Sequence, residues 1–435
     1  MRQRRLITAL GAAGLLLIAA ACGGDDDDTS DADGSATTVA AAATDAPAAT
    51  EAPAETTAAP AGTEAPAGTE APATDAPDGA MTELGEGEGE VNLIAWAGYV
   101  EDGSTDPAVD WVTPFEDATG CTVNVKTGNS SDEMVQLMQS GEYDGVSASG
   151  DATQRLIAGG EVAPINPDLI PNYADIYEGL KLQPWNSVDG VPYGVPHGRG
   201  ANLLVYNTEA FAGAEPDSLS VMFEESPASG SVSVYDSPIY IADAALYLMA
   251  TQPDLGIENP YALDETQFAA AIELLEAQEA LVGQYWALYT DQQAALESGG
   301  VLAGTTWQVI VNLATGNGAK INAVKTKEGA TGWSDTWMIS SSAEHPNCMY
   351  MWMDHIASPE ANAAVAEWFG EAPSNAEACT LTADPEHCAT FHAEDDGYWD
   401  DVWYWTTATE ECLDGRDVSC VPYSDWVTAW SELRS

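Results

Sequence analysis

The chain has 435 residues, and 12 Lys and Arg stand against 70 Asp and Glu, which gives a formal net charge of −58. Nucleic acid is close to excluded as a partner, because no basic stripe exists to release counterions from phosphates. An anionic lipid surface is disfavoured for the same reason. Apolar residues make up 45% of the chain, so most of it can bury a core, and its 14 Trp do not suit a disordered protein.

The first 22 residues have the parts of an export signal. Three Arg precede an apolar run from Leu6 to Ala21, which ends at Cys22 and is followed by Gly and Asp. This resembles a bacterial lipoprotein signal, although Ala19 stands where that signal prefers Leu. We predict that residues 1–22 are removed as a signal peptide and that lipid on Cys22 holds the exported protein at the membrane. The expected location is the outer face of the cell membrane or the periplasmic space. An ordinary signal peptide with an incidental Cys is the alternative.

Residues 23–90 form a segment of low complexity. They are mostly Ala, Thr, Pro and Gly, with 17 acidic residues, no Lys or Arg, and near-repeats such as TEAPAGTEAPA. Nothing in this composition can bury an apolar face. We therefore predict a disordered, self-repelling linker that ends at the folded body.

The first part of the body alternates strands with helices. Strands are predicted at 91–96, 121–128 and 143–149, and helices at 107–118, 130–141 and 150–160. A Gly-punctuated strand or crossover follows at 192–206. Such alternation predicts βαβ units and a mostly parallel sheet.

A second series of elements follows. Strands are predicted at 231–237, 301–307, 321–324 and 336–342, and helices at 239–251, 265–282 and 346–369. The fold class is therefore α/β, with two lobes between which the chain passes more than once. Lobe 1 is predicted from 91–200 and 308–342, and lobe 2 from 201–307 and 343–435. A cleft between lobes is a natural site for a small ligand.

Six cysteines remain after Cys22. They are Cys121, Cys348, Cys379, Cys388, Cys412 and Cys420. An even number in an exported protein favours three disulfides, although six cysteines allow 15 pairings. The most local pairs are Cys379–Cys388 and Cys412–Cys420, which would leave the first two cysteines for each other. Zinc is the competing interpretation, but the sequence has no CxxC and its five His are scattered, so no metal is expected.

Catalytic signatures are absent from the sequence. It has no GxSxG elbow, no HExxH and no P-loop. Acidic pairs such as Asp395–Asp396 occur throughout this composition, so no glycosidase-type pair stands out. We predict that the protein is not an enzyme, with a surface hydrolase and an adhesion or structural lipoprotein as the alternatives.

Seven segments of the body are informative when they are taken in order. They are LIAWAGYV (93–100), GCTVNVKTGNSSDEMVQLMQSGEYDGVSAS (120–149), DGVPYGVPHGRGANLLVYNTEAF (189–211), SVYDSP (233–238), GTTWQ (304–308), KEGATGWSD (327–335) and EAPSNAEA (371–378). Together they resemble the spermidine/putrescine-binding receptors of bacterial ABC importers. The resemblance implies a two-lobed, periplasmic-binding-protein-like fold with hinge crossovers and a central cleft. It also implies a monomeric receptor without a cofactor that delivers a small-molecule solute to an ABC importer permease.

The same resemblance implies which residues line the cleft. They are Trp96, Tyr99, Ser149, Asp151, Asp236, Tyr240, Trp307 and Asp335. Aromatic faces suit the ammonium groups and the methylene chain of a polyamine, and carboxylates fix the ammonium ends. Core packing is the alternative role for each Trp, and an Asx-turn before Pro238 is the alternative for Asp236.

Some positions depart from the family pattern. Asp151 stands where relatives often have an aromatic residue, and Gln308 and Val309 follow Trp307 where relatives supply an Asp. Arg199 replaces an aromatic residue, and in the cleft it would bind an anionic group through two parallel hydrogen bonds. A hinge Arg paired with an acid is the alternative. We predict a polyamine-like solute, with an anionic or zwitterionic solute as the alternative.

Overall fold

The computed structural model describes residues 76–435, so the predicted signal peptide, Cys22 and most of the predicted linker lie outside the described residues. No helix among residues 76–435 is long and apolar enough to cross a membrane. Residues 76–89 contain no helix or strand, but they contact the body. The carbonyl of Met81 accepts a hydrogen bond from Asn166, and Glu88 accepts from the backbone of Asn347 and Cys348. The linker was predicted to extend to residue 90, but residues 76–89 already pack on the body.

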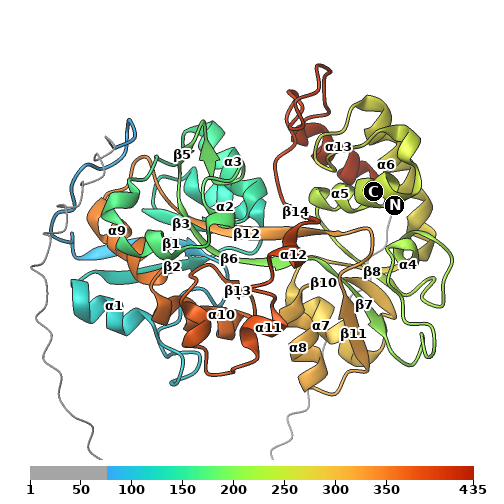
Figure 1. The fold of residues 1–435 in the computed structure, drawn as a ribbon, viewed down its shortest axis with the longest axis horizontal. Coiled ribbons are helices and arrows are strands. Elements are labelled where there is room, and N and C mark those ends of the chain that lie inside the picture. Colours follow the sequence, from blue (N-terminus) through green and yellow to red (C-terminus); the bar gives the residue numbers. More distant parts are fainter. Residues whose placement is uncertain (1–75) are drawn as a thin grey trace, which may run out of the picture. The chain divides into compact units, whose positions relative to one another are not determined.

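The first of two large sheets runs in the order β13-β6-β12-β3-β1-β2, with β14 paired to β12 (Figure 1). Its strands are β1 (Glu90–Ala95), β2 (Thr122–Thr127), β3 (Gly145–Ala148), β6 (Val195–Ala201), β12 (Ala330–Ile339), β13 (Ala372–Pro373) and β14 (Val402–Tyr404). The three N-terminal strands pair in parallel, as the βαβ pattern predicts. The long strand β12 is antiparallel to both β3 and β6. A separate hairpin joins β4 (Ser187–Val188) and β5 (Val191–Pro192).

Lobe 1 consists of this sheet and the helices packed on it. These helices are α1 (Val112–Thr119), α2 (Ser131–Met138), α3 (Gly150–Gly159), α9 (Pro346–Ile356) and α10 (Pro359–Phe369). The side chain of Ser130 caps α2 and that of Ser358 caps α10. The sequence prediction assigned α9 and α10 to lobe 2, and the structure differs. Trp352 and Met353 of α9 are buried against Leu93 of β1, because the apolar face of α9 covers the first sheet.

Lobe 2 is built on the second sheet, whose order is β11-β7-β10-β8-β9. Its strands are β7 (Leu203–Asn207), β8 (Val232–Tyr235), β9 (Val282–Trp286), β10 (Ala303–Thr306) and β11 (Ile321–Val324). Its helices are α4 (Ser220–Phe223), α5 (Ile241–Thr251), α6 (Glu265–Gln278), α7 (Tyr289–Ser298) and α8 (Gln308–Gly316). A capping box between Asp264 and Gln267 starts α6. The prediction put residues 308–329 in lobe 1, but β11 pairs with β7 and so belongs to lobe 2.

Strands β6 and β12 connect the two lobes (Figure 1). Trp333 of β12 is buried in the core of lobe 2, whereas Trp337 of the same strand is buried in the core of lobe 1. The pairing of β12 with β6 shifts register between Asp335 and Thr336. Asp335 therefore lies where β12 passes from one core to the other.

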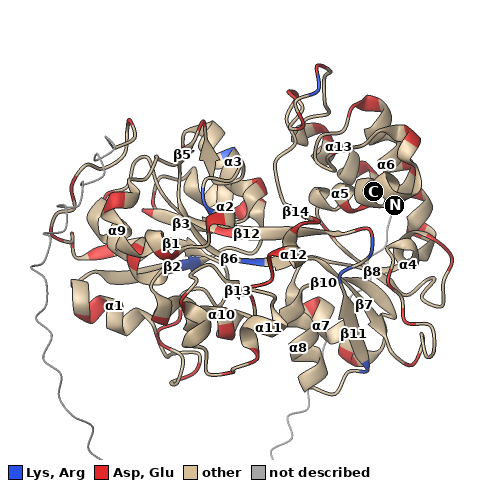
Figure 2. Ribbon diagram, in the orientation of Figure 1, with Lys and Arg blue, Asp and Glu red and all other residues tan. Residues whose placement is uncertain are grey.

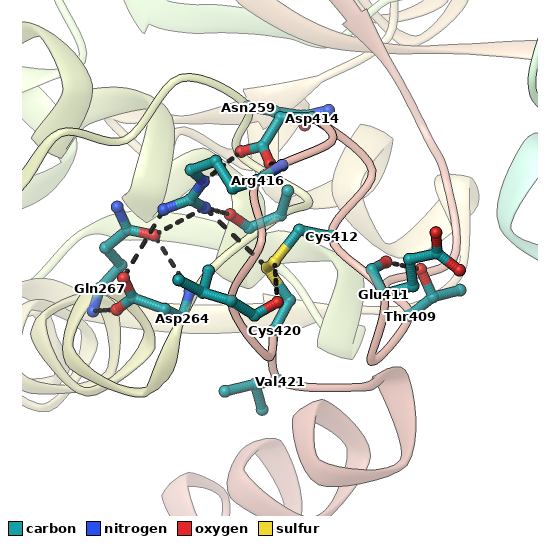
Figure 3. The surroundings of a disulfide bond; sticks show 12 residues. Asn259, Asp264, Gln267, Thr409, Glu411, Cys412, Asp414, Arg416, Cys420 and Val421 are labelled. Atoms are coloured by element: carbon teal, nitrogen blue, oxygen red, sulfur yellow. Dashed lines mark hydrogen bonds and ion pairs between the residues drawn. A yellow bond between two sulfur atoms is a disulfide. The ribbon is translucent and has the colours of Figure 1, made fainter.

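The C-terminal segment contains α11 (His387–Thr390), α12 (Asp396–Trp399), β14 and α13 (Tyr423–Leu433). Trp426 and Trp430 of α13 are buried in the core of lobe 2. The loop before α13 is fixed to the start of α6 by Arg416, which lies 2.7 Å from Asp414 and donates a hydrogen bond to Gln267 (Figure 3). Helix α13 therefore completes lobe 2, whereas β14 belongs to the first sheet.

The six predicted cysteines form three disulfides. The pairs are Cys121–Cys348, Cys379–Cys388 and Cys412–Cys420. The first pair joins residues 227 positions apart and links the start of β2 to α9 within lobe 1. The prediction of a disulfide framework is confirmed, and the structure selects one of the 15 pairings.

Candidate functional site

A cavity of about 270 Å³ is lined by side chains from both lobes. Most of its wall is aromatic. The rings are those of Trp96, Tyr235, Tyr289, Trp307, Trp333, Phe369 and Trp405. They come from loops, strand ends and helix ends of both lobes, from β12 and, for Trp405, from the C-terminal segment just after β14. The cavity is therefore suited to a small solute with an apolar or cationic surface.

The rings of the lobe 2 wall are fixed by one another. Tyr235 stacks on Trp405 with 5.8 Å between ring centroids, and it meets Trp307 at 64° with 5.6 Å between centroids. The indole Nε1 of Trp307 donates a hydrogen bond of 2.9 Å to Asn202. Because the rings face the cavity at different angles, they can surround a cation with several π-faces.

Asp335 is the one charged residue in the lining of this cavity, as far as residues 76–435 are concerned. Only 2% of its surface is exposed. Ser149 donates a hydrogen bond of 2.6 Å to its Oδ1, and Tyr99 donates one of 2.9 Å to its Oδ2. Burial raises the pKa of Asp335 to about 6, and these two hydrogen bonds oppose the rise. No Lys, Arg or His within 76–435 forms an ion pair with it, so at neutral pH the cavity holds an uncompensated negative charge.

A second buried carboxyl group, that of Glu371, is linked to Asp335 through the hydroxyl group of Tyr99. The hydroxyl oxygen of Tyr99 lies 3.0 Å from Oε2 of Glu371, a residue that is fully buried. A tyrosine hydroxyl has a single proton to donate, so one of its two carboxyl partners must itself carry a proton. Burial holds the pKa of Glu371 well above its usual range, so Glu371 is that partner. Burial also lowers the pKa of the adjacent His197 to about 3, which keeps this imidazole neutral.

A much smaller cavity of about 10 Å³ shares the rings of Tyr235, Trp307 and Trp405 with the large one. Its lining includes the carboxyl group of Asp243, on α5, and the hydroxyl-bearing residues Thr305 and Thr306. The small cavity therefore lies behind the aromatic wall of lobe 2, and a few polar side chains stand in its mostly apolar lining.

Four of the residues predicted for the cleft line the large cavity. They are Trp96, Ser149, Trp307 and Asp335. Tyr99 lies beneath it, fully buried, and reaches the site only through its bond to Asp335. Tyr240 lines the small cavity, and its hydroxyl accepts a hydrogen bond from Gln278 in the core of lobe 2.

Two predicted carboxylates are not in the lining of either cavity, and each has an arginine partner. Asp151 is buried, accepts a hydrogen bond from Ser131 and lies 3.6 Å from Arg155. Burial raises the pKa of Asp151 to about 6, and Arg155 opposes the rise. Asp236 lies 3.2 Å from Arg434 and accepts a hydrogen bond from the indole of Trp430. The cleft prediction is corrected for both, because α3 and α13 supply their charge partners.

Arg199 is also outside both cavities. It is buried, and its guanidinium lies 4.2 Å from the ring centroid of Trp399. Its Nη2 donates a hydrogen bond of 3.2 Å to the carbonyl of Ala393. Neither predicted role matches this position: Arg199 does not line the cleft, and no acid among residues 76–435 lies within ion-pair distance of it. The π-face of Trp399 takes the place of the expected acid.

Several lining residues were missed by the sequence reasoning. They are Asn129, Tyr235, Asp243, Tyr289, Trp333, Phe369 and Trp405, with Glu371 beneath. A signal existed for Tyr235 and Trp333, because each stands one or two positions from a predicted site residue. Trp405 comes from a segment beyond the recognised motifs, where the aromatic run YWDDVWYW (398–405) indicated a place in the second lobe or at the rim of the cleft.

Two lobes joined by crossing strands, with an aromatic and acidic cavity lined from both, define a receptor that binds a small solute. Residues 110–389, more than half of the chain, match the family described as bacterial extracellular solute-binding protein. The chain belongs to this family. Its members are solute receptors and not enzymes, which removes the hydrolase alternative.

Individual relatives are distant but cover most of the chain. The chain is 23% identical over 321 residues to spermidine/putrescine-binding periplasmic protein 1 of Haemophilus influenzae, with 72% of this chain and 84% of the relative covered. It is 22% identical over 308 residues to the putrescine/agmatine-binding protein of Pseudomonas aeruginosa, with 67% and 80% covered. A solved structure of a spermidine/putrescine ABC transporter protein from Listeria monocytogenes aligns with a TM-score of 0.65 at 17% identity, covering 80% of this chain and 99% of that one. The predicted two-lobed α/β fold is thereby confirmed.

Proposed function

We propose that this protein is the substrate-binding protein of an ABC importer and that its solute is a polyamine-like organic ammonium ion. The observation that carries the proposal is the combination of seven aromatic rings with a single charged lining residue, the carboxylate of Asp335. An ammonium ion would compensate this buried charge, and the rings would attract the cation and cover its methylene groups. The two relatives are named as binding proteins for spermidine and putrescine and for putrescine and agmatine, which agrees with this class of solute.

Capture follows from the position of the cavity between the lobes. A solute that contacts Asp335 in lobe 1 and Trp307 in lobe 2 interacts with both walls only when the lobes are together. Its binding free energy therefore favours the closed state over an open one. Strands β6 and β12 are the segments through which such a hinge motion would pass.

An anionic or zwitterionic solute is the weaker candidate. Its carboxylate or phosphonate would need a positive partner, and the lining of the large cavity includes no Lys, Arg or His from residues 76–435. Arg199, the residue predicted for that role, packs on Trp399 instead. An anion near Asp335 would also be repelled by that carboxylate.

The test is a panel of solutes titrated into the purified chain by calorimetry, with thermal unfolding in parallel. Putrescine and spermidine should bind and raise the melting temperature, because a ligand that binds only the folded state stabilises it. An amino acid and a phosphonate serve as the contrasting ligands. Binding of either of these without any response to amines would contradict the proposal.

We propose further that the protein is attached to the membrane by lipid on Cys22, where it would deliver solute to the permease. The support is the sequence of residues 1–22, with its Arg residues, apolar run and small residues before Cys22. A Cys22→Ser variant should lose the lipid and either leave the membrane fraction or remain as uncleaved precursor. Unchanged processing and membrane retention would contradict the anchor.

A further inference from the structure

Asp243 is a buried carboxyl group without a role in the site described so far. It lies on α5 with 7% of its surface exposed, and its Oδ1 accepts a hydrogen bond of 3.0 Å from Thr331. Throughout residues 76–435, no cation lies within ion-pair distance of it, and the structure gives its Oδ2 no hydrogen-bond partner. Burial raises its pKa to about 7. A carboxylate buried in this way is costly unless something supplies a positive charge.

The small cavity beside Asp243 has the size for one ammonium group and a carboxyl residue in its lining. Its volume of about 10 Å³ is close to the space that a single water molecule requires, and an ammonium group is of similar size. Thr305 and Thr306 line the same space and offer hydroxyl oxygens as further acceptors. Together with the second oxygen of Asp243, these hydroxyl groups are the side-chain acceptors that the lining offers to the N–H donors of a primary ammonium.

One face of β12 leads from Thr331, which is bonded to Asp243, to Asp335 in the middle of the strand. Successive side chains of a strand point to opposite faces, so Thr331, Trp333 and Asp335 share a face. Asp243 is bonded to Thr331 at one end of this row, and Asp335 faces the large cavity at the other. Four residues of strand correspond to ~13 Å, which sets the scale of the separation. A four-carbon diamine with an ammonium–carboxylate bond at each end spans roughly 12 Å.

Trp307, whose ring lines both cavities, is connected to Asp243 by a chain of hydrogen bonds. Trp307 donates to Asn202 at 2.9 Å, Asn202 donates to Thr331 at 2.8 Å, and Thr331 donates to Asp243. The rings of Trp307 and Trp405 line both cavities. A solute that occupies both cavities requires these rings to move apart, and its methylene chain would then lie along their faces.

We infer that Asp243 is a second ammonium-binding residue and that the solute is a short linear diamine bridging Asp335 and Asp243. This inference rests on the proposed function, because it requires that the cavity of Asp335 binds an ammonium ion. It assigns the distal charge contact to Asp243 and not to Asp236, which is held by Arg434.

The experiment compares putrescine with 1-aminobutane, which has the same carbon chain and one ammonium group, by calorimetry on the full chain. The wild type should bind putrescine about 10- to 100-fold more tightly than 1-aminobutane, the scale of a desolvated charge pair. Asp243→Asn, which keeps the size of the side chain, should remove this preference and leave the affinity for 1-aminobutane unchanged. Asp236→Asn is the matched control in the same lobe and should retain the preference.

A second readout uses the wild type alone. Binding of an ammonium group to Asp243 should release about half a proton at pH 7, because the free carboxyl group is about half protonated there. The charge of Asp243 raises the pKa of the nearby Tyr240 and Tyr261. Both tyrosines stay neutral at pH 7, so neither contributes to the proton release. Calorimetry in two buffers of different ionisation enthalpy should show more proton release with putrescine than with 1-aminobutane.

The outcomes separate the two proposals. If neither amine binds to the wild type, the proposed function fails. If both bind but the preference for putrescine survives in Asp243→Asn, or if the two amines release equal numbers of protons, the diamine inference fails while the amine receptor stands.

Discussion

The two lobes line the cavity with different chemistry. Lobe 1 brings a carboxylate to the cavity surface, where Ser149 and Tyr99 orient the oxygens of Asp335. Lobe 2 brings the rings of Tyr235 and Trp307 and keeps its unpaired carboxyl group, Asp243, behind them. One wall therefore offers charge directly, and the other offers aromatic surface first.

This difference indicates an order of events during capture. Charge acts over several ångströms, whereas contact with a ring needs van der Waals distance. Acidic residues are spread over both lobes and basic residues are few (Figure 2), so the field of the whole molecule also attracts cations. We expect a cation to meet the lobe 1 wall first and the rings of lobe 2 to enclose it on closure.

The largest effect is expected from removing the charge of the lobe 1 wall. Asp335→Asn should weaken amine binding by about 2–5 kcal/mol, because the ammonium would be buried without its charge partner. Calorimetry with putrescine measures the loss, and Asp236→Asn serves as the control because Asp236 is not in the lining of either cavity. Equal affinities in Asp335→Asn and the wild type would show that the charge of the lobe 1 wall does not contribute to amine binding.

A change to the framework should affect stability and leave both walls intact. Replacing Cys121 and Cys348 with Ala should lower the free energy of unfolding by about 2–4 kcal/mol, since this bridge closes a long loop. The affinity for amines should stay the same, because neither cysteine lines a cavity. Denaturant unfolding and calorimetry on the same variant check both statements. A large loss of affinity under conditions in which the variant is fully folded would contradict them.

The aromatic wall of lobe 2 should contribute less per residue than the charge of lobe 1. Trp307→Ala and Trp405→Ala should each weaken binding by about 1–2 kcal/mol, the scale of a desolvated cation–π contact. Trp368→Ala is the control, because Trp368 is exposed and lies outside the cavity lining. Unaltered affinity in both wall variants would place the solute elsewhere.

The smallest effect is that of pH on the lobe 1 wall. The pKa of Asp335 is raised to about 6, and a cation binds the ionised form, so the affinity for a monoamine such as 1-aminobutane should be near its maximum at pH 7 and fall as the pH drops through 6. Between pH 7 and pH 5 the affinity should decrease about tenfold. Calorimetry across this range tests the direction, and a flat profile or tighter binding in acid would contradict it.

The sequence was sufficient for much of the fold and for four of the nine residues predicted for the cleft. Apolar periodicity located most strands and helices, and ordered motifs located Trp96, Ser149, Trp307 and Asp335. The sequence prediction placed α9 and α10 in the wrong lobe. Both lobes have helices with one apolar face, and periodicity does not say which sheet that face covers.

The charge partners of the carboxylates could not be predicted, because they depend on segments far apart in the chain. Asp236 meets Arg434 from the last helix, 198 residues later, and that pairing removes it from the site. Asp243 has no such partner among residues 76–435, and nothing in its local sequence distinguishes it from the other acidic residues. In so acidic a chain, the few positions of Lys and Arg decide which carboxylates are left for a ligand.

The most direct test of the central claim is a crystal structure of the protein grown with putrescine. We expect the solute in the cavity between the lobes, with an ammonium group within hydrogen-bond distance of Asp335 and its methylene groups against Trp307 and Trp405. Solute bound away from Asp335, or an anion bound in the cavity in its place, would contradict the account.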